Sequence, residues 1–122
     1  MNRSETGRAG EDTACRYLEK KGYTVERRNY RAGRCEIDII ARDGEAYAFV
    51  EVKTRRNRAY GAGREAVTAQ KQKNIIAAAL LFLQAEGLEA VPCRFDVIEI
   101  TGLGVGQRIE HIINAFDVEI DE

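Results

Sequence analysis

Residues 36–53 read EIDIIARDGEAYAFVEVK and contain two apolar runs separated by Asp43-Gly44. An Asp-Gly dipeptide between two apolar runs is a strong signal of a tight hairpin turn. We therefore predict two antiparallel strands, over residues 36–42 and 46–53. This hairpin decides the fold class, because the neighbouring segments are then interpreted as strands and helices that pack against it.

Successive side chains of a strand point to opposite faces of its sheet, so the hairpin has two distinct faces. A two-residue turn would pair Arg42 with Glu45 and place Glu36 opposite Glu51. One face is then uniformly apolar, with Ile37, Ile39, Ala41, Ala48, Val50 and Val52. The other face is apolar near the turn and charged at its far end, with Ile40, Tyr47 and Phe49, then Glu36, Asp38, Glu51 and Lys53. Apolar residues on both faces indicate a sheet that is covered on both sides.

Asp38 and Glu51 are diagonal neighbours in this register, about 7–8 Å apart at the backbone, so their carboxylates can converge. Converging carboxylates repel each other unless a cation or a shared proton lies between them. A hard cation with oxygen ligands, Mg²⁺ or Mn²⁺, fits such a pair. Lys53 is on the same face, where it can position an attacking water or stabilise charge on a phosphate. The structural alternative is a cross-strand ladder of salt bridges, although three acids and one lysine make a poor ladder.

The rest of the chain predicts helices and further strands. Helical spacing of apolar residues predicts a helix over residues 11–21, and the charged segment 23–30 suits a strand at the edge of a sheet. Thr68 is the predicted N-cap of a long helix that ends at Gly87. Its buried stripe is expected to consist of Ile75, Ile76, Ala79, Leu80 and Leu83. Two more strands are predicted over residues 92–100 and 107–116.

The resulting order is helix, three strands, helix, two strands, which is typical of a mixed α/β sheet flanked by helices. A chain of 122 residues with 44% hydrophobic residues can bury a core without disulfides. We expect one domain over residues 1–122, with a loose N-terminus over about residues 1–6. The acidic end, over about residues 117–122, is also expected to be loose.

The composition excludes a disordered chain, a collagen-like repeat and a disulfide-dense secreted scaffold. Cys15, Cys35 and Cys93 are too far apart in sequence for a zinc site, so three separate thiols in a reducing cytoplasm are expected. We identify no signal peptide, and no apolar run approaches the ~20 residues that span a bilayer. The sequence therefore predicts a soluble, cytoplasmic protein without a membrane partner.

Positive charge is concentrated in the first 74 residues, whereas residues 75–122 have an acidic excess. The arginines form two clusters, Arg27, Arg28, Arg31 and Arg34, then Arg55, Arg56, Arg58 and Arg64. Clustered arginines near turns indicate a polyanionic partner such as DNA or another structured nucleic acid. The alternative is a solvated surface with salt bridges.

Five short motifs together resemble a known family: Gly10-Glu11, Asn29-Tyr30-Arg31, Glu36-Ile37-Asp38, Phe49-Val50-Glu51-Val52-Lys53-Thr54-Arg55 and Arg94-Phe95-Asp96-Val97. They are similar to the YraN family, small bacterial proteins of uncharacterised role that are related to archaeal Holliday-junction resolvases. Asp38 with Glu51-Val52-Lys53 resembles the D…ExK core of restriction-endonuclease-like nucleases. The resemblance extends from about residue 7 to about residue 116.

This resemblance implies a restriction-endonuclease-like fold, with Asp38 and Glu51 as ligands of Mg²⁺ or Mn²⁺ and Lys53 as the catalytic lysine. It further implies that Glu11 is a helix carboxylate that completes the site. Resolvase-like proteins cut as symmetric dimers, so the resemblance also implies a homodimer.

Further positions add detail to this expectation. Gln70 or Lys71, at the start of the second helix, is expected to face the same site. Cys35 stands where the family usually has glycine, which would alter the turn that enters the strand without removing a ligand. Glu11 has an alternative role as an acid that complements the dipole of its helix.

The expected function is that of a nucleic-acid-binding protein, a Mg²⁺-dependent endonuclease that hydrolyses phosphodiesters in branched or structured DNA. The expected nucleic-acid contacts are Arg31, Arg34, Arg55, Arg56, Arg58, Arg64 and Lys71. Two alternatives stay open: a non-catalytic nucleic-acid-binding or adaptor protein, and a phosphate-processing enzyme acting on small nucleotides. His111 is expected to be an ordinary strand residue, and Asp96 a buried structural acid.

Overall fold

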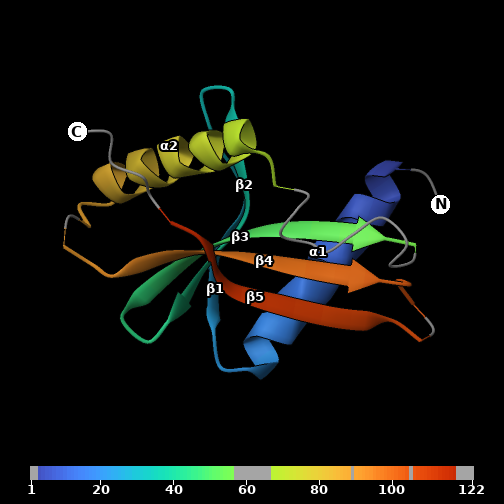
Figure 1. Cartoon of the computed structure of the whole chain (residues 1–122). Coiled ribbons are helices and arrows are strands. Elements are labelled where there is room, and N and C mark those ends of the chain that lie inside the picture. Colours follow the sequence, from blue (N-terminus) through green and yellow to red (C-terminus); the bar gives the residue numbers. More distant parts are fainter. Residues whose placement is uncertain (1–2, 57–66, 89, 105, 118–122) are drawn as a thin grey trace.

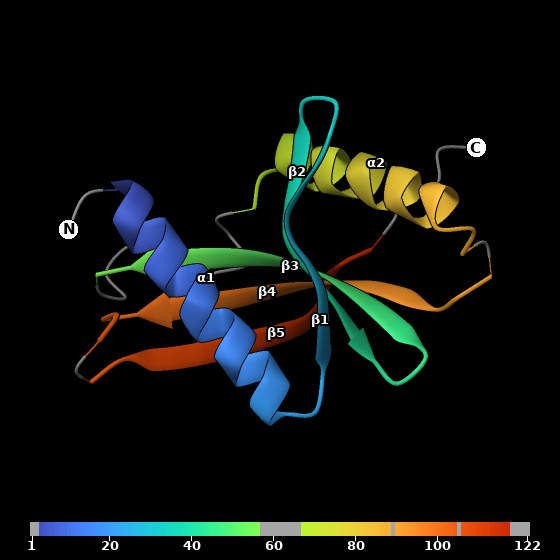
Figure 2. The same ribbon diagram turned by 180° about the vertical axis from the view of Figure 1, so that it is seen from behind.

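The computed structural model of the chain describes residues 3–56, 67–88, 90–104 and 106–117. Its elements follow in the order α1 (Arg3–Lys20), β1 (Thr24–Ala32), β2 (Cys35–Asp43), β3 (Ala46–Arg55), α2 (Ala69–Ala85), β4 (Cys93–Thr101) and β5 (Arg108–Phe116). The strands form one sheet in the order β1-β2-β3-β4-β5, with α1 and α2 packed on opposite faces (Figures 1 and 2). The predicted order of elements and the mixed α/β class are confirmed.

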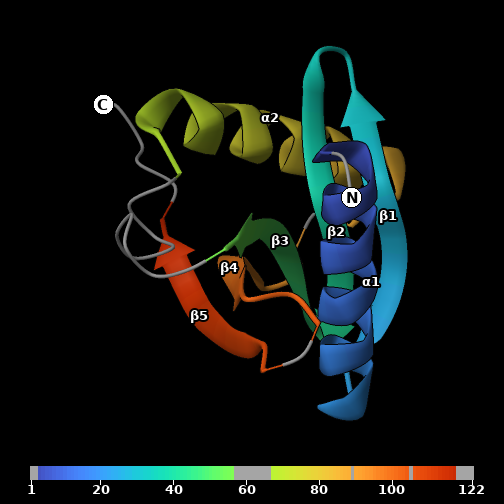
Figure 3. The same ribbon diagram turned by 90° about the vertical axis from the view of Figure 1, so that its right-hand side faces the viewer.

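The sheet is mixed because α2 is part of the crossover between two parallel strands, β3 and β4, while every other neighbouring pair is antiparallel. The charged strand β1 lies at one edge, as its sequence predicts, and β5 lies at the other. Seen from the side, the two helices cross the strands in clearly different directions (Figure 3). Strand β3 therefore has α1 on one face and α2 on the other, two helices that come from distant parts of the sequence.

Helix α1 begins at Arg3, which corrects the expected start near residue 11. Its first turn includes residues 3–6, which were expected to belong to a loose N-terminus. The early turns have few apolar side chains, so no apolar periodicity reveals them in the sequence. They are nevertheless attached to the sheet, because Gly10 is buried where α1 packs on Thr54 of β3. At the other end of the chain, residues 118–122 of the expected loose tail lie outside the described residues.

Gly10→Ala is expected to destabilise the fold by about 1–2 kcal/mol. A Cβ at position 10 would overlap Thr54 Oγ1. Such overpacking typically costs ~1–3 kcal/mol, more than the ~1 kcal/mol that alanine gains over glycine in a helix. Urea unfolding measures the change, and adding Thr54→Ala should recover most of the loss. An unchanged midpoint in Gly10→Ala would mean that Thr54 rotates away at little cost.

The β2–β3 hairpin forms as predicted but with a corrected register. Asp43 pairs with Ala46, and Ile39 pairs with Val50, so Gly44 and Glu45 form the turn instead of Asp43 and Gly44. Gly44 has a φ of +62°, a conformation that glycine adopts without strain. The pairing differs from the expected one by two residues, and a shift of two keeps the side chains of the paired residues on their predicted faces.

The two faces of the hairpin contribute to separate cores. Ile39, Ala41, Ala48 and Val50 pack with Ala14 and Leu18 of α1. Ile40 and Phe49 pack under α2 together with Phe95 and Val97 of β4. Ile37 is a correction, because it joins the core under α2 instead of the face it was predicted to share with Ile39. The regular pairing of β2 with β3 stops at Ile39, so the residues before it are not held to the plane of that pair.

Helix α2 has the predicted N-cap, since Thr68 Oγ1 accepts a hydrogen bond from the Lys71 N–H at 3.2 Å. Its buried face consists of Ile75, Ala78, Ala79 and Phe82. The predicted stripe is therefore partly wrong, because Leu80 is 60% exposed. Residues 75–83 are apolar on every side of the helix, so periodicity cannot identify the buried face. The packing of the Phe82 ring against Tyr30, Tyr47 and Phe49 identifies it instead.

A polar network is buried on the α1 side of the sheet. Asp96 of β4 is fully buried and lies 2.8 Å from His111 Nε2, while the Asn114 N–H donates to it at 2.9 Å and Arg94 Nε at 3.1 Å. Burial alone would raise the pKa of Asp96, but these hydrogen bonds and the Arg94 charge hold it below its ordinary value. Asp96 and His111 therefore have the structural roles that the sequence predicts.

The three cysteines are free thiols, as expected: Cys15 is buried, Cys35 is half-buried and Cys93 is exposed. Within the described residues, neither helix combines the length and apolar character needed to cross a bilayer.

Candidate active site

A cleft of 390 Å³ opens where the start of β2, the middle of β3 and the first turns of α2 meet. Arg34 and Cys35, at the β1–β2 turn and the start of β2, line it together with residues of the first turns of α2. The cleft is lined by Arg34, Cys35, Glu36, Asp38, Glu51, Thr68, Gln70, Lys71, Asn74 and Ile75. Both predicted metal ligands, Asp38 and Glu51, and two of the predicted nucleic-acid contacts, Arg34 and Lys71, therefore line one cleft.

Asp38 and Glu51 meet where the β2–β3 ladder ends. Beyond the Ile39–Val50 pair, the Val52 N–H donates to Asp38 Oδ2 at 2.8 Å instead of to a backbone carbonyl. In this register Asp38 is level with Glu51, which corrects the expected diagonal arrangement. The side chain of Glu51 is only 4% exposed, so the two acids meet in a largely buried space.

The surroundings of Asp38 favour its neutral form. Burial and the charge of Glu51 raise the pKa of Asp38 to about 7, and the charge of Glu11 adds to this, although the Val52 hydrogen bond opposes it. Asp38 therefore holds its proton more firmly than an ordinary aspartate does. A cation between Asp38 and Glu51 would favour the ionised form of both.

Two lysines contact the same oxygen of Glu51. Lys71 Nζ lies 2.5 Å from Glu51 Oε1, and Lys53 Nζ lies 3.6 Å from it. Burial and the hydrogen bond with Lys71 lower the pKa of Lys53, although Glu51 opposes this. Burial would also lower the pKa of Lys71, but its contacts with Glu51 raise it overall. The pair therefore consists of one firmly charged ammonium and one that loses its proton more readily.

Glu11 lies near these acids but does not line the cleft. Burial raises the pKa of Glu11, while a hydrogen bond with Asn29 and the charge of Arg28 oppose the shift. Its Oε1 is buried without a hydrogen-bond partner among the described residues. The charge of Glu11 contributes to raising the pKa of Asp38, so Glu11 lies within electrostatic reach of that acid. Its role as a completing carboxylate stays a prediction.

Gln70, which was expected to face the site, and the arginines predicted to contact nucleic acid have different surroundings. Gln70 lines the cleft, but it is exposed and its amide donates to Asn74 Oδ1 at 3.0 Å. Arg34 also lines the cleft and is exposed. Arg31 is more exposed still and lies 3.6 Å from Glu36. Arg58 and Arg64 lie outside the described residues.

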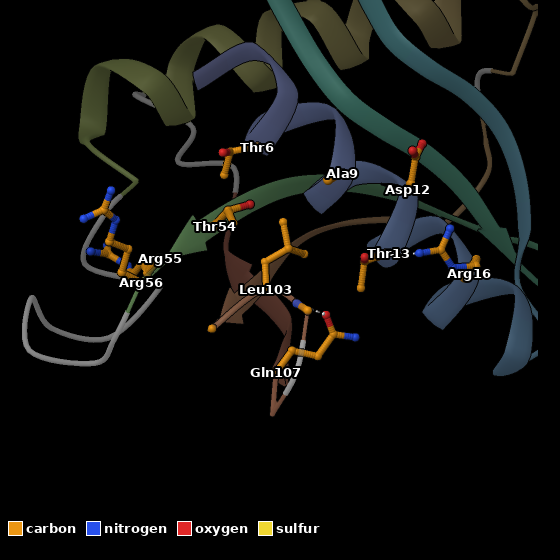
Figure 4. Close-up of a pocket in the computed structure, with 12 residues that line it drawn as sticks. Thr6, Ala9, Asp12, Thr13, Arg16, Thr54, Arg55, Arg56, Leu103 and Gln107 are labelled. Atoms are coloured by element: carbon orange, nitrogen blue, oxygen red, sulfur yellow. Dashed lines mark hydrogen bonds between the residues drawn. The ribbon is translucent and has the colours of Figure 1, made fainter. Parts of the chain in front are cut away.

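Arg55 and Arg56 line a second and larger cavity, of 830 Å³, between α1 and the β4–β5 connection (Figure 4). Arg55 also pairs with the buried Glu99 at 3.5 Å. Arg16 of α1 lies across the cavity from Arg56, and the sequence analysis missed it. A helical spacing from Thr6 through Ala9 and Thr13 to Arg16 was the available signal, but the helix was expected to begin too late to include Thr6 and Ala9. This cavity is larger than the acidic cleft, but its acids and bases do not converge as those of the cleft do.

Sequence reasoning expected Gln70 or Lys71 to face this site, and both line the cleft, but it did not identify the direct contact between Lys71 and Glu51. The spacing of Thr68, Lys71 and Asn74 places all three on one side of the first turns of α2, and this signal was available. That this side meets β3 depends on how α2 docks on the sheet, which a local pattern does not reveal.

The donor atoms of the cleft fit a hard divalent cation. Mg²⁺ commonly takes one or two carboxylates and completes its coordination with water and substrate phosphates. Asp38 and Glu51 provide two such carboxylates. In the part of the chain that the structure describes, no three Asp, Glu, His or Cys side chains gather as a candidate metal cage. The donor set therefore suits Mg²⁺ or Mn²⁺ shared with water and a phosphate, and not a closed protein site.

Fold and site together define a mixed α/β domain with an acid pair in a cleft beside its central strand and two lysines in contact with one of those acids. The chain belongs to the family described as Uncharacterised protein family UPF0102, whose model matches residues 10–100. It is 50% identical to a UPF0102 protein of Geobacter sulfurreducens over 113 residues, which cover 92% of this chain and 88% of the relative. It is 46% identical to a UPF0102 protein of Desulfosudis oleivorans over 118 residues, which cover 97% and 94%. The predicted YraN-like family is thereby confirmed.

Proposed function

We propose that this protein is a metal-dependent endonuclease that hydrolyses phosphodiester bonds in branched or structured DNA. The observation that carries the proposal is the convergence of Asp38, Glu51 and Lys71 in one cleft, with Lys53 Nζ 3.6 Å from Glu51 Oε1. Two acids forced together beside a polyanion would oppose simple DNA binding, because they repel the phosphates. The same acids are useful if a divalent cation joins them to the phosphate.

Asp38 and Glu51 would hold Mg²⁺ or Mn²⁺, which activates a water and neutralises charge on the phosphate when bound. The Val52 N–H fixes Asp38 Oδ2, so one ligand is oriented by the backbone of β3. Lys53 is half-buried and holds its proton less firmly than an exposed lysine. It is therefore suited to orienting the attacking water and exchanging a proton with it. Arg34 extends from the β1–β2 turn into the cleft and can contact the neighbouring phosphate.

A second candidate function is nucleic-acid binding without cleavage, as in an adaptor protein that retains the fold. The larger cavity favours it, because Arg16 and Arg56 lie there, away from the acid pair (Figure 4). Phosphate contacts made there would not require Asp38 or Glu51.

A cleavage assay distinguishes the two functions. Four-way, flapped, single-stranded and linear duplex DNAs are incubated with Mg²⁺, Mn²⁺ or a chelator. We expect cleavage of branched DNA that depends on the metal and is lost in Glu51→Gln. Glu45→Gln, an exposed acid of the hairpin turn, is the matched control and should cleave as the parent does. Binding of branched DNA without cleavage in either metal would favour the adaptor function.

The DNA affinity is expected to fall steeply with salt, and Arg16→Ala with Arg56→Ala should make that dependence shallower. Each arginine that contacts a phosphate contributes about one to the slope of log affinity against log salt, so the double variant should lose about two. Fluorescence anisotropy over a series of salt concentrations measures the slope. Arg42→Ala is the control, because Arg42 pairs with Glu26 at 3.0 Å near the hairpin turn. An unchanged slope in the double variant would mean that the larger cavity does not contact DNA.

A further inference from the structure

The first turn of α2 holds a lysine against a buried acid. Lys71 Nζ lies 2.5 Å from Glu51 Oε1, the side chain of Glu51 is 4% exposed, and that of Lys71 is 43% exposed. The ammonium therefore lies between the solvent and the more buried of the two predicted metal ligands. It contacts an oxygen that a divalent cation would need.

The stability of α2 does not explain this lysine. Lys71 donates its backbone N–H to the N-cap Thr68, so it belongs to the first turn of the helix. A positive charge in the first turn is opposed by the helix dipole, and the first turn of α2 contains no acid to offset it. The contact that stabilises the Lys71 charge is the one with Glu51, on a different element.

Lys71 is also the more exposed of the two lysines that contact Glu51. Lys53 Nζ lies 3.6 Å from the same oxygen, but its side chain is only 23% exposed and starts from the central strand β3. The Lys71 side chain starts at the rim of the cleft, and its flexible four-carbon stem can turn outward without any change in the backbone. Arg34 lies on the same rim, so an ammonium turned outward would stay where a phosphate is expected.

We propose that Lys71 is a resident counter-ion of the site, which neutralises Glu51 before metal binds and moves to a phosphate of the nucleic acid when metal takes its place. This inference rests on the proposed function, because it assigns the metal to Asp38 and Glu51. It has a thermodynamic consequence. Metal alone has to displace an ammonium and binds weakly, whereas nucleic acid provides the displaced ammonium with a new partner. Metal and nucleic acid therefore bind cooperatively, and each increases the affinity for the other by the same factor.

The first test is a calorimetric titration of Mn²⁺ alone into the parent, Lys71→Met and Lys73→Met. Lys71→Met is expected to bind Mn²⁺ at least about tenfold more tightly than the parent, since a nearby positive charge in a partly buried cleft opposes a divalent cation strongly. Lys73 is on the same helix but exposed, so Lys73→Met should bind as the parent does.

The second test compares the salt dependence of DNA binding by two proteins, Lys53→Met and the double variant Lys53→Met with Lys71→Met. Both lack Lys53 so that the DNA stays intact. In Mn²⁺, the slope of log affinity against log salt should be smaller by about one in the protein that also lacks Lys71, because one phosphate contact is missing. In chelator the two slopes should agree, since Lys71 then stays on Glu51. A merely structural role for Lys71 would not produce a difference that depends on metal.

The outcomes separate this inference from the proposed function. Equal or weaker Mn²⁺ binding in Lys71→Met, with binding in the parent intact, overturns the counter-ion role and leaves the metal site standing. Mn²⁺ binding in neither protein overturns both. If Lys71→Met does not fold, Lys71→Gln keeps a polar group in place and is measured in the same way.

Discussion

Lys53→Met is expected to lower the rate of DNA cleavage at least about 100-fold while DNA binding stays close to that of the parent. General acid–base and electrostatic contributions of a single positioned group are typically of this size or larger. Methionine retains much of the aliphatic stem, so the packing of the half-buried side chain is largely preserved. Lys53 lies 3.6 Å from Glu51 Oε1, whereas Lys71 lies closer and remains to neutralise that acid. Loss of Lys53 should therefore affect the reaction more than the assembly of the site.

Single-turnover cleavage of a branched DNA in Mn²⁺ provides the measurement, and Lys73→Met provides the control for removal of a lysine. Because the pKa of Lys53 is lowered, the cleavage rate of the parent should change at pH values below those at which an ordinary lysine titrates. The cleavage rate of Lys53→Met should lack that change. A variant that cleaves within about threefold of the parent would remove Lys53 from the proposed reaction.

Asp38→Asn is expected to stabilise the fold by about 1–2 kcal/mol at about pH 8 in chelator. The pKa of Asp38 is about 7 in the folded chain and 3.8 in the reference state, so the folded protein keeps this proton over a range in which the unfolded chain loses it. The contribution of Asp38 to the free energy of unfolding therefore falls as the pH rises from about 4 to about 7, and stays low above that. Asparagine does not titrate, and its Oδ1 can still accept from the Val52 N–H.

Urea titrations at about pH 5 and about pH 8, each with and without Mg²⁺, give the required comparison. The free energies of unfolding of the parent and the variant should differ less at the lower pH, where the unfolded chain also retains part of the Asp38 proton. Mg²⁺ should stabilise the parent at the higher pH and have little effect on Asp38→Asn, because only a folded site with both carboxylates binds it well. Were the variant less stable than the parent at the higher pH in chelator, Asp38 would be an ion-pair partner and not half of a repelling pair.

The fold could be predicted largely because its strands have clear turn signals and alternating faces. The order of elements and the faces of Asp38, Glu51 and Lys53 followed from these signals. The register did not, since Asp43-Gly44 and Gly44-Glu45 are both acceptable turns and the choice between them depends on the whole sheet. The error did not change the faces of the paired residues, because it amounted to two residues, but Ile37 lies before the first pair and joins the other core.

Features that depend on contacts between distant elements could not be predicted. Residues 75–83 are apolar on all sides, so the exposed position of Leu80 is determined by how Phe82 packs on the sheet. The contact between Lys71 and Glu51 depends on the same docking of α2. The homodimer and the nucleic-acid partner remain predictions, because they concern surfaces that a single chain does not test.

The hydrogen bond from the Val52 N–H to Asp38 also equips the protein with a spectroscopic reporter. Most amides of a strand donate to a neighbouring carbonyl, whose charge is constant, whereas this one donates to a carboxylate at 2.8 Å. Its proton and nitrogen resonances should therefore follow the charge on Asp38, with a midpoint set by the pKa of about 7. A cation bound at Asp38 would move that midpoint to lower pH. One backbone signal near the centre of the sheet can thus record whether the cleft holds a proton or a metal.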